Sequence, residues 1–238
     1  MTASHWTDLN RQQLTELLPD ALVLLPVGAT EQHGPHLQTG TDTLLATTVV
    51  QRAAQLAATT RPLVLAPPLP YGCSDHHLPF GGTLSLSPET MLATLLDIAR
   101  SLQIDGARRL FIINGHGGNI GPCHSAAAAA STRHGLAVAY ANYWDLSGTG
   151  DSPGHAGAFE TSAVASLHPL AAPAPDRPTQ PEVPAAAGVT VHTQALWQAI
   201  DGYSDTPSAR TPEQGAAWLD ACAKGLAERI DHLAEALA

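Results

Sequence analysis

Basic residues are scarce in this sequence, and their scarcity excludes one large class of partners. The 238 residues include 11 Lys and Arg against 21 Asp and Glu, so the formal net charge is -10 with histidine neutral. A nucleic-acid surface needs clustered Lys and Arg to neutralise phosphates, and the few basic residues present here are scattered. We therefore expect no nucleic acid among the partners of this protein.

Cysteines and long apolar runs are also few. The three cysteines, Cys73, Cys123 and Cys222, lie far apart and are odd in number, which predicts a reducing compartment rather than a disulfide framework. Cys73 and Cys123 could in principle be soft metal ligands, but without a C-x-x-C partner we expect them to be buried small hydrophobes. No apolar run approaches the ~18 residues of a membrane span. The polar stretch from Thr2 to Gln13 also lacks the pattern of a signal peptide. We expect a cytoplasmic protein with no membrane partner.

The order of apolar runs and helical patterns predicts a layered α/β fold within a single domain over residues 1–238. A short helix capped by Thr7 or Asp8 is expected first, and a helix from Pro212 to Leu237 is expected last. Between them, short apolar runs alternate with helical patterns, which is typical of parallel βαβ units. The expected strands are 21–27, 63–66, 110–113 and 136–143, and the expected helices are 42–58, 88–102 and one that ends near Arg133. The segment from Pro169 to Pro184 is expected to be irregular surface.

Carboxylates and imidazoles crowd the segment that follows the first expected strand. The motif Glu31-Gln32-His33-Gly34-Pro35-His36 is followed closely by Thr41-Asp42. Carboxylate oxygens and imidazole nitrogens are ligands of divalent transition metals. Each residue also has an ordinary explanation: Asp42 as a helix cap, Glu31 as a solvated charge, and the histidines as loop residues. Their coincidence in one loop favours a metal site, with Asp42 as the candidate carboxylate that bridges two metals.

Two later segments add further candidates. His116 lies in Asn114-Gly115-His116-Gly117-Gly118-Asn119, where glycines allow close approach to a ligand and positive φ. His155 and Glu160 lie in the segment 154–162. His155 could act as an acid or base, or be an ordinary loop histidine, and Glu160 could instead be a first-turn helix acid. Because ligands bind beyond the carboxyl ends of parallel strands, we expect the loops after the first and third strands to converge.

Weaker candidates surround these motifs. Asp75, His76 and His77 are possible pocket walls, and because adjacent side chains point in different directions we expect at most one of the two histidines to face the site. Tyr143 and Trp144 follow the fourth expected strand and could line a pocket, although aromatic residues there are more often part of the core.

These motifs resemble the creatininase family of metal-dependent amidohydrolases. The likeness also includes Phe80-Gly81-Gly82-Thr83, and it continues more weakly through segments 202–204 and 212–215. It implies a three-layer α/β/α sandwich with a mostly parallel central sheet and two divalent metal ions, Zn, Mn or Fe. Glu31, Asp42 and His116 match the ligands of one metal, and His33 and Asp42 match ligands of the other.

Two positions depart from creatininase proper. A glutamate two residues after the glycine-flanked histidine completes the second metal there, whereas Gly118 stands at that position here; we predict Glu160 as the substitute ligand. Creatininase proper also carries a tryptophan four residues before the histidine that matches His155, and Asp151 stands there in this chain. Trp144 does resemble a second pocket tryptophan of the family.

The resemblance leads to a specific prediction of function. We predict a metal-dependent amidohydrolase that cleaves a C–N bond of a small cyclic amide or formamide-type substrate by a metal-bound hydroxide. The alternatives are a peptidase that trims a small precursor peptide, as in mycofactocin maturation, and a noncatalytic metal-binding protein. The resemblance also implies a homo-oligomer, often a hexamer. The residues assigned are the catalytic His155 and Glu160, the metal ligands Glu31, His33, Asp42, His116 and Glu160, and the substrate pocket Ser74, His76, Gly117 and Trp144.

Overall fold

A five-stranded sheet forms the middle of the protein, in a computed structural model that describes residues 3–150, 152–177, 189 and 191–237. The strand order is β1-β3-β2-β4-β5 and every pairing is parallel. The edge strand β1 was not predicted, because two residues carry no detectable alternation of polar and apolar side chains. The strands are β1 (Ser4–His5), β2 (Leu22–Val27), β3 (Leu63–Leu65), β4 (Arg109–Asn114) and β5 (Ala137–Asn142).

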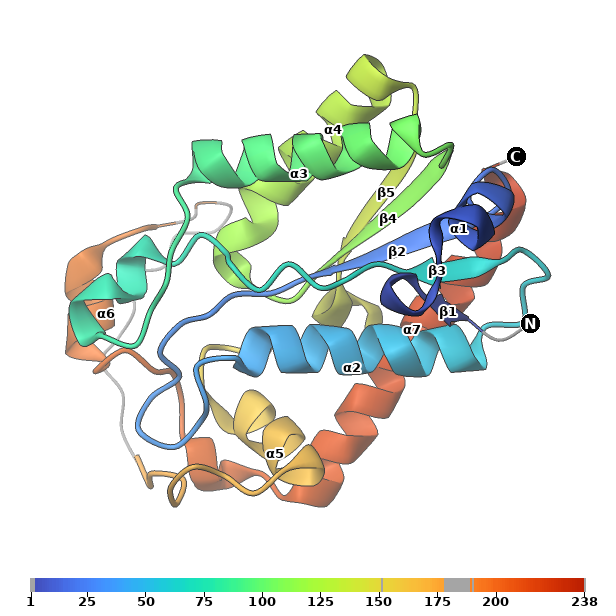
Figure 1. Ribbon diagram of the computed structural model, residues 1–238. Coiled ribbons are helices and arrows are strands. Elements are labelled where there is room, and N and C mark those ends of the chain that lie inside the picture. The colour runs from blue at the N-terminus through green and yellow to red at the C-terminus, as the bar shows by residue number, and fades with distance from the viewer. Residues whose placement is uncertain (1–2, 151, 178–188, 190, 238) are drawn as a thin grey trace.

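Helices cover both faces of this sheet (Figure 1). On one face lie α3 (Pro88–Ile104) and α4 (Ile120–His134), and on the other lie α2 (Thr41–Leu56), α5 (Ala158–Leu167) and α7 (Pro212–Ala236). Two short helices, α1 (Arg11–Leu17) and α6 (Gln194–Ala199), stand outside these layers. The predicted three-layer α/β/α sandwich is therefore confirmed, whereas α6 was not predicted. No helix among the described residues is long and apolar enough to cross a membrane.

The core is divided by the sheet into two clusters. Strands β2 and β4 are buried along their whole length, because helices cover both of their faces. Met91, Leu95 and Cys123 belong to the cluster beneath α3 and α4, and Trp218 and Cys222 belong to the cluster around α7. All three cysteines are free and buried, which confirms the prediction for Cys73 and Cys123.

Local hydrogen bonds explain where two of the helices begin. The Ser87 hydroxyl accepts a hydrogen bond from the Thr90 N–H and so caps α3. The prediction that Thr7 or Asp8 caps the first helix is wrong, because Asn10 takes this role through a reciprocal pair of hydrogen bonds with Gln13. Residues 169–177 contain no helix or strand, as expected, and the rest of the Pro169–Pro184 segment lies outside the described residues.

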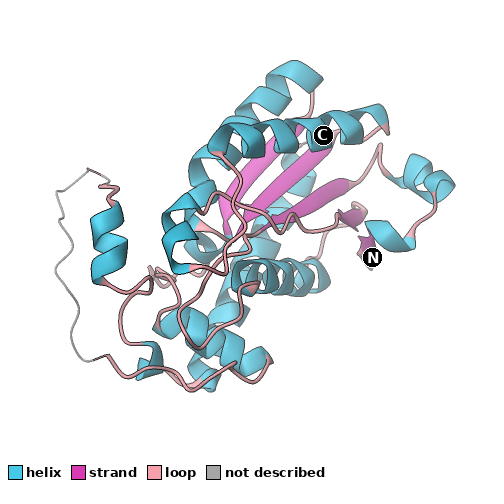
Figure 2. Cartoon of the chain, turned by 60° about the vertical axis from the view of Figure 1, so that its left-hand side comes forward, coloured by secondary structure: helices cyan, strands magenta, loops and turns pink. Residues whose placement is uncertain are grey.

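The carboxyl ends of the strands all face one side, where the long loops gather (Figure 2). The loop after β2 leads into α2, and the loop after β4 leads through the 3-10 turn η3 (Gly117–Asn119) into α4. The chain after β3 contains the 3-10 helix η2 (Asp75–Phe80). This arrangement places each predicted motif at the same edge of the sheet.

Candidate metal centre

Five predicted side chains meet beyond the ends of β2 and β4, which are neighbours in the sheet. All five are buried, although they come from four separate segments. The loop after β2 supplies Glu31 and His33, the first turn of α2 supplies Asp42, the loop after β4 supplies His116, and the first turn of α5 supplies Glu160.

Asp42 stands at the centre of this group. Its Oδ1 lies 3.1 Å from His33 Nε2, and its Oδ2 lies 3.2 Å from His116 Nδ1. Glu31 Oε1 lies 3.3 Å from His116 Nδ1, and Glu160 Oε2 lies 3.8 Å from His33 Nε2. Two triads result, Glu31–Asp42–His116 and His33–Asp42–Glu160, each with ligand atoms within 4.8 Å of one another.

The alternative role of Asp42 as a helix cap is wrong. Gly40 occupies the N-cap position of α2, and no side chain caps this helix. Asp42 lies inside the first turn, and its carboxylate points to the two histidines instead of the backbone. The buried carboxylate therefore serves the cluster rather than the start of the helix.

The two histidines are held in the orientation that metal ligands require. His33 Nδ1 lies 3.0 Å from the Glu31 carbonyl oxygen, and His116 Nε2 lies 3.1 Å from the Cys73 carbonyl oxygen. A carbonyl oxygen only accepts, so each of these nitrogens carries the proton of the neutral ring. The other nitrogen of each ring then presents its lone pair to the carboxylates, as in metal-bound histidines.

Buried oxygen atoms without partners indicate a cation. Both carboxylate oxygens of Glu31 and the Oδ2 of Asp42 are buried without a hydrogen bond. Burying a carboxylate without compensation is costly. Cations bound between these oxygens and the facing imidazole nitrogens would give each unpartnered oxygen a partner. The residues present therefore fit divalent metal ions.

Electrostatics in the metal-free cluster is dominated by burial and by the facing charges. Burial alone would lower the pKa of His33, but the carboxylates of Asp42 and Glu160 outweigh it and raise this pKa to about 10. Glu31 and Asp42 likewise overcome burial and raise the pKa of His116 well above its ordinary value. Burial raises the pKa of Glu160 to about 8, although His33 opposes the change. Protons therefore occupy the positions that cations would take.

The glycine that matters most beside His116 is Gly118, because the space around it has no room for a side chain. None of Gly115, Gly117 and Gly118 has a positive φ, so that part of the prediction is wrong. A Cβ on Gly118 would overlap the Cys73 carbonyl oxygen and would lie 2.6 Å from His116 Nε2. A glutamate therefore cannot stand at 118 in this conformation without moving the carbonyl that holds His116.

A cavity of about 720 Å³ opens onto the cluster. Asp42, His116, His155 and Glu160 are among the residues that line it. Of the four residues predicted to form the substrate pocket, His76, Gly117 and Trp144 line it.

Two residues of the cavity region differ from the prediction. Ser74 is buried and does not belong to the lining; its hydroxyl lies 3.3 Å from His116 Nε2. Trp197 of α6 does line the cavity and was not predicted, because a short helix gives little sequence signal. Asp151 lies outside the described residues.

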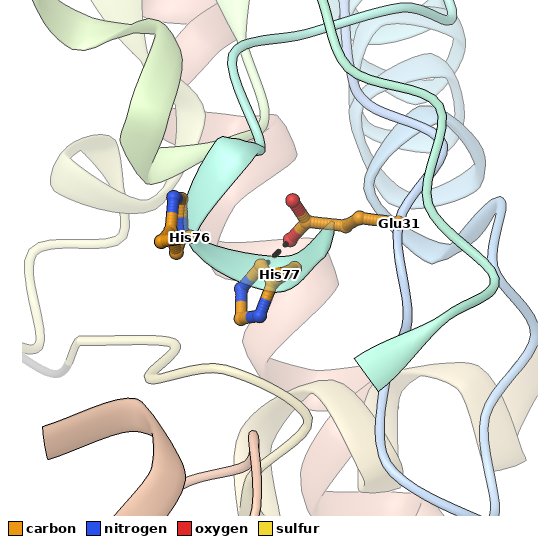
Figure 3. Close-up of side chains that lie close together, drawn as sticks. All are labelled: Glu31, His76 and His77. Carbon is orange, nitrogen blue, oxygen red and sulfur yellow. Dashed lines mark ion pairs between the residues drawn. The ribbon is translucent and has the colours of Figure 1, made fainter. Parts of the chain in front are cut away.

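Both histidines of η2 line the cavity, so the expectation that at most one faces the site is wrong. His77 Nε2 lies 3.6 Å from Glu31 Oε1, and Figure 3 shows Glu31 reaching toward the turn that carries both rings. The ring of His76 is parallel to that of His116, with centroids 5.9 Å apart. Burial and His155 lower the pKa of His77 to about 2, so its ring is neutral.

His155 is buried and lines the cavity. Its Nδ1 is 3.2 Å from Glu31 Oε1, and its Nε2 is 2.9 Å from the carbonyl oxygen of Gln32. Burial and the nearby His33 lower its pKa. The neutral ring therefore carries its proton on Nε2 and leaves Nδ1 as a base. The backbone N–H of His155 donates to the Ser204 hydroxyl at 2.8 Å.

Two other residues near the cluster hold its framework. His36 is buried, but its Nε2 pairs with the Thr161 hydroxyl at 2.8 Å and lies outside the metal triads. Asp205 accepts a hydrogen bond at 2.7 Å from the Ala158 N–H and so fixes the start of α5. Asp205 was not predicted, because nothing in its neighbours along the chain points to the first turn of a distant helix.

The parallel sheet and the buried cluster of carboxylates and imidazoles are both features that the predicted family resemblance implies. A family model described as "Creatininase: Creatinine amidohydrolase" matches residues 7–230. The chain belongs to the creatininase family, which confirms the predicted resemblance.

Among curated relatives, the mycofactocin precursor peptide peptidase of Mycobacterium ulcerans is 38% identical over 152 residues, which cover 62% of this chain and 58% of the relative. The chain thus spans less than two thirds of the mycobacterial relatives it matches first. The creatinine amidohydrolase of Pseudomonas putida is 30% identical over 250 residues, which cover 89% of both chains.

Solved structures agree with these relatives. A crystal structure of creatinine amidohydrolase superposes with a TM-score of 0.80 at 28% identity and covers 98% of both chains. A creatininase described as the Mn form has a TM-score of 0.75 at 28% identity and covers 97% of this chain and 98% of its own. With the clustered carboxylates and imidazoles, these relatives support a divalent metal at this centre.

Proposed function

We propose that this protein is an amidohydrolase that uses two divalent metal ions to cleave a C–N bond of a small cyclic amide or formamide-type substrate. The observation that carries the proposal is the position of Asp42, whose two oxygens face His33 and His116 at 3.1 and 3.2 Å. A carboxylate that presents one oxygen to each of two triads is suited to bridge a pair of metals. Zinc, manganese and iron all accept such ligands.

Each triad would hold one ion. Glu31, Asp42 and His116 would bind the first, and His33, Asp42 and Glu160 the second. Divalent ions in such a pair supply, when bound, a water nucleophile that is active near neutral pH and a polarised substrate carbonyl. The protein contributes the fixed geometry of the buried ligands and a cavity through which the substrate reaches them.

His155 would assist the departure of the amine. Because the Gln32 carbonyl accepts the proton on its Nε2, its Nδ1 is free to take a proton and to pass it to the leaving nitrogen. Glu160 lines the same cavity, and its carboxylate is held by the N–H of Ala156. It would therefore contribute both as a ligand and as a group that faces the substrate.

A peptidase acting on a small peptide with the same metals is the second candidate. It is favoured by the 38% identity to mycofactocin precursor peptide peptidases. The cavity of about 720 Å³ also leaves room for the end of a peptide. A noncatalytic metal-binding protein is less well supported, because Glu160 is available to complete a triad with His33 and Asp42 although Gly118 offers no ligand.

Hydrolysis assays separate these candidates. The protein loaded with Mn or Zn is expected to hydrolyse one of a panel of creatinine and formamides, and the metal-free protein is expected to be inactive. Turnover of short peptides without turnover of creatinine or formamides would decide for the peptidase. Two bound ions per chain with no hydrolysis of any substrate would favour the noncatalytic alternative.

The assembly and location of the protein are further parts of this proposal. The family resemblance leads us to propose a homo-oligomer, with a hexamer as the expected size, in the cytoplasm. Size-exclusion chromatography with light scattering measures the assembly directly, and a monomeric mass at working concentration would contradict it.

A further inference from the structure

Asp75 is a carboxylate of the cavity wall that neither metal triad uses. It is the first residue of η2, it is exposed, and it lines the cavity that opens onto the cluster. Its Oδ1 accepts a hydrogen bond at 2.5 Å from the Ser85 hydroxyl. In the part of the chain that the structure describes, its Oδ2 has no hydrogen-bond partner and no basic side chain forms an ion pair with it.

The cavity has no basic side chain to balance this charge. Its described lining includes the carboxylates of Asp42, Asp75 and Glu160 but no Lys or Arg. Positions 1–2, 151, 178–188, 190 and 238, which lie outside the described residues, contain no Lys or Arg either. The lining also contains histidines, but imidazole is ordinarily neutral at pH 8. Bound cations would compensate Asp42 and Glu160, so the charge of Asp75 remains to act on a molecule that enters.

An aromatic ring packs against the same turn. Trp197 of α6 lines the cavity and is half-buried. Its ring lies against those of His76 and His77, the two residues that follow Asp75, with centroids 5.0 and 4.6 Å away. The Gln194 side chain donates a hydrogen bond at 3.0 Å to the His76 carbonyl oxygen, which ties α6 to η2. Because a tryptophan ring attracts organic cations, this wall offers a positive group both a carboxylate and a ring.

The cavity has room for more than the amide that reacts. Its volume of about 720 Å³ lies within the ~300–1,000 Å³ typical of pockets for drug-sized ligands. Asp42, His116 and Glu160 contribute the part of the lining that belongs to the metal centre, whereas Asp75 and Trp197 come from η2 and α6. A substrate that fills this space has a second group, away from the reacting amide, whose charge these two residues can select.

We propose that the cavity selects amides whose non-reacting end is a cation, such as an alkylammonium or a guanidinium group, and that Asp75 is the specificity-determining residue. The proposal rests on the proposed amidohydrolase function and names the substrate class of the same site. The cationic end donates hydrogen bonds to Asp75 and packs on Trp197, whereas an anionic end meets an uncompensated carboxylate. The net charge of -10 also disfavours anions, but this long-range effect is shared by every exposed acid and is screened by salt.

The affinities of matched hydroxamates test the proposal without turnover. 5-Aminopentanohydroxamate, pentanohydroxamate and the monohydroxamate of glutaric acid share a metal-binding head and have chains of similar length, but their far ends are cationic, neutral and anionic. In the zinc-loaded protein at pH 8 and low salt, the cationic compound should bind about tenfold more tightly than the anionic one, with the neutral compound between them. Added salt should narrow this difference. An anionic compound that binds as tightly as the cationic one overturns the proposal.

Variants show whether Asp75 is the source of the preference. Asp75→Asn keeps an acceptor for the Ser85 hydroxyl but removes the charge, and it should reduce the preference from about tenfold to about twofold. Asp75→Glu should retain the preference. Asp97→Asn is the matched control, because Asp97 is an exposed aspartate outside the cavity, and it should change nothing. An unchanged preference in Asp75→Asn, or an equal loss in Asp97→Asn, overturns the proposal.

Hydrolysis distinguishes failure of the proposed function from failure of this proposal. N-(4-aminobutyl)formamide should be hydrolysed with a kcat/KM about tenfold above that of 4-formamidobutanoate. If the metal-loaded wild type hydrolyses no amide or peptide, the proposed function fails, and the hydroxamate affinities still decide the role of Asp75. If it hydrolyses amides without preferring a cationic end, the function stands and this proposal fails. Absence of binding by all of the hydroxamates also overturns it.

Discussion

His33 Nε2 and Asp42 Oδ1 lie 3.1 Å apart, both buried, at the point where the loop after β2 meets the first turn of α2. The other oxygen of Asp42 faces His116. One carboxylate thus joins two loops that are remote in sequence, in the position that a bridge between two metal ions requires.

Asp42→Asn should reduce the bound metal from two ions per chain to one or none, because an amide is a poor bridge between cations. Activity should fall by about 10²-fold or more, as expected when a metal is lost. Elemental analysis after dialysis measures the metal. Asp220→Asn, which breaks an exposed ion pair with Arg52, is the control and should leave both quantities unchanged. Two tightly bound ions in Asp42→Asn would refute the bridging role.

Glu160→Gln should lose the ion held by His33, Asp42 and Glu160 and retain the other. Glu89→Gln is the matched control, because Glu89 is also an acid in the first turn of a helix but is exposed. If Glu160 served only the helix macrodipole, both variants would lose a similar ~0.3–1 kcal/mol of stability and no metal. Full activity and full metal content in Glu160→Gln would remove this residue from the ligand set.

Gly118→Ala should weaken metal binding by displacing either the Cys73 carbonyl or His116. The overlap should also destabilise the fold by about 1–3 kcal/mol. Gly117→Ala serves as the neighbouring comparison, since no atom lies within 4 Å of its added Cβ. Metal titrations and thermal unfolding of the two variants test the difference. Equal metal affinity in both would show that the small size of Gly118 does not matter.

The metal-free protein should be most stable near pH 6.5. Above this pH, the folded protein retains a proton on His33 (pKa about 10), whereas the unfolded chain loses it. Glu160 (pKa about 8) and His116 also hold protons more tightly in the folded protein. The free energy of unfolding therefore falls as pH rises. In the folded protein, His36 and His76 have a pKa of about 4 and stay neutral just below pH 6.5. In the unfolded chain the same histidines take up protons below pH 6.5, so the free energy of unfolding falls as the pH drops.

Bound metal should change the dependence of stability on pH only above pH 6.5. Cations replace the protons on His33 and His116, so the loss of stability above pH 6.5 should disappear in the loaded protein. Thermal unfolding from pH 4 to 9, with a chelator and with added Mn, provides the comparison. A metal-free protein that gains stability steadily from pH 6.5 to 9 would contradict the pKa values of His33 and Glu160.

The sequence was sufficient to predict four of the five strands and, with the family resemblance, the five clustered side chains. Buried strands read as unbroken apolar runs, and the residues directly after such runs lie at a common edge, which is why Glu31, His33 and His116 could be placed together. Glu160 could be selected because a ligand was missing at Gly118 and a carboxylate was available nearby in the family pattern.

The supporting residues could not be predicted, because their roles depend on contacts between distant segments. The Gln32 amide nitrogen lies 2.8 Å from His77 Nδ1 and donates a hydrogen bond to the carbonyl oxygen of Gly202, 170 residues away. Asp205 and Trp197 likewise act on segments far from them in sequence. A pattern of polar and apolar residues carries no information about such contacts, so the second layer of the site became visible only in the structure.

A crystal structure of the Mn-loaded protein, with anomalous difference density, tests the central claim most directly. We predict two manganese peaks about 3.5–4 Å apart, one on each side of the Asp42 carboxylate. A single peak, or peaks that Asp42 does not touch, would contradict the dinuclear centre.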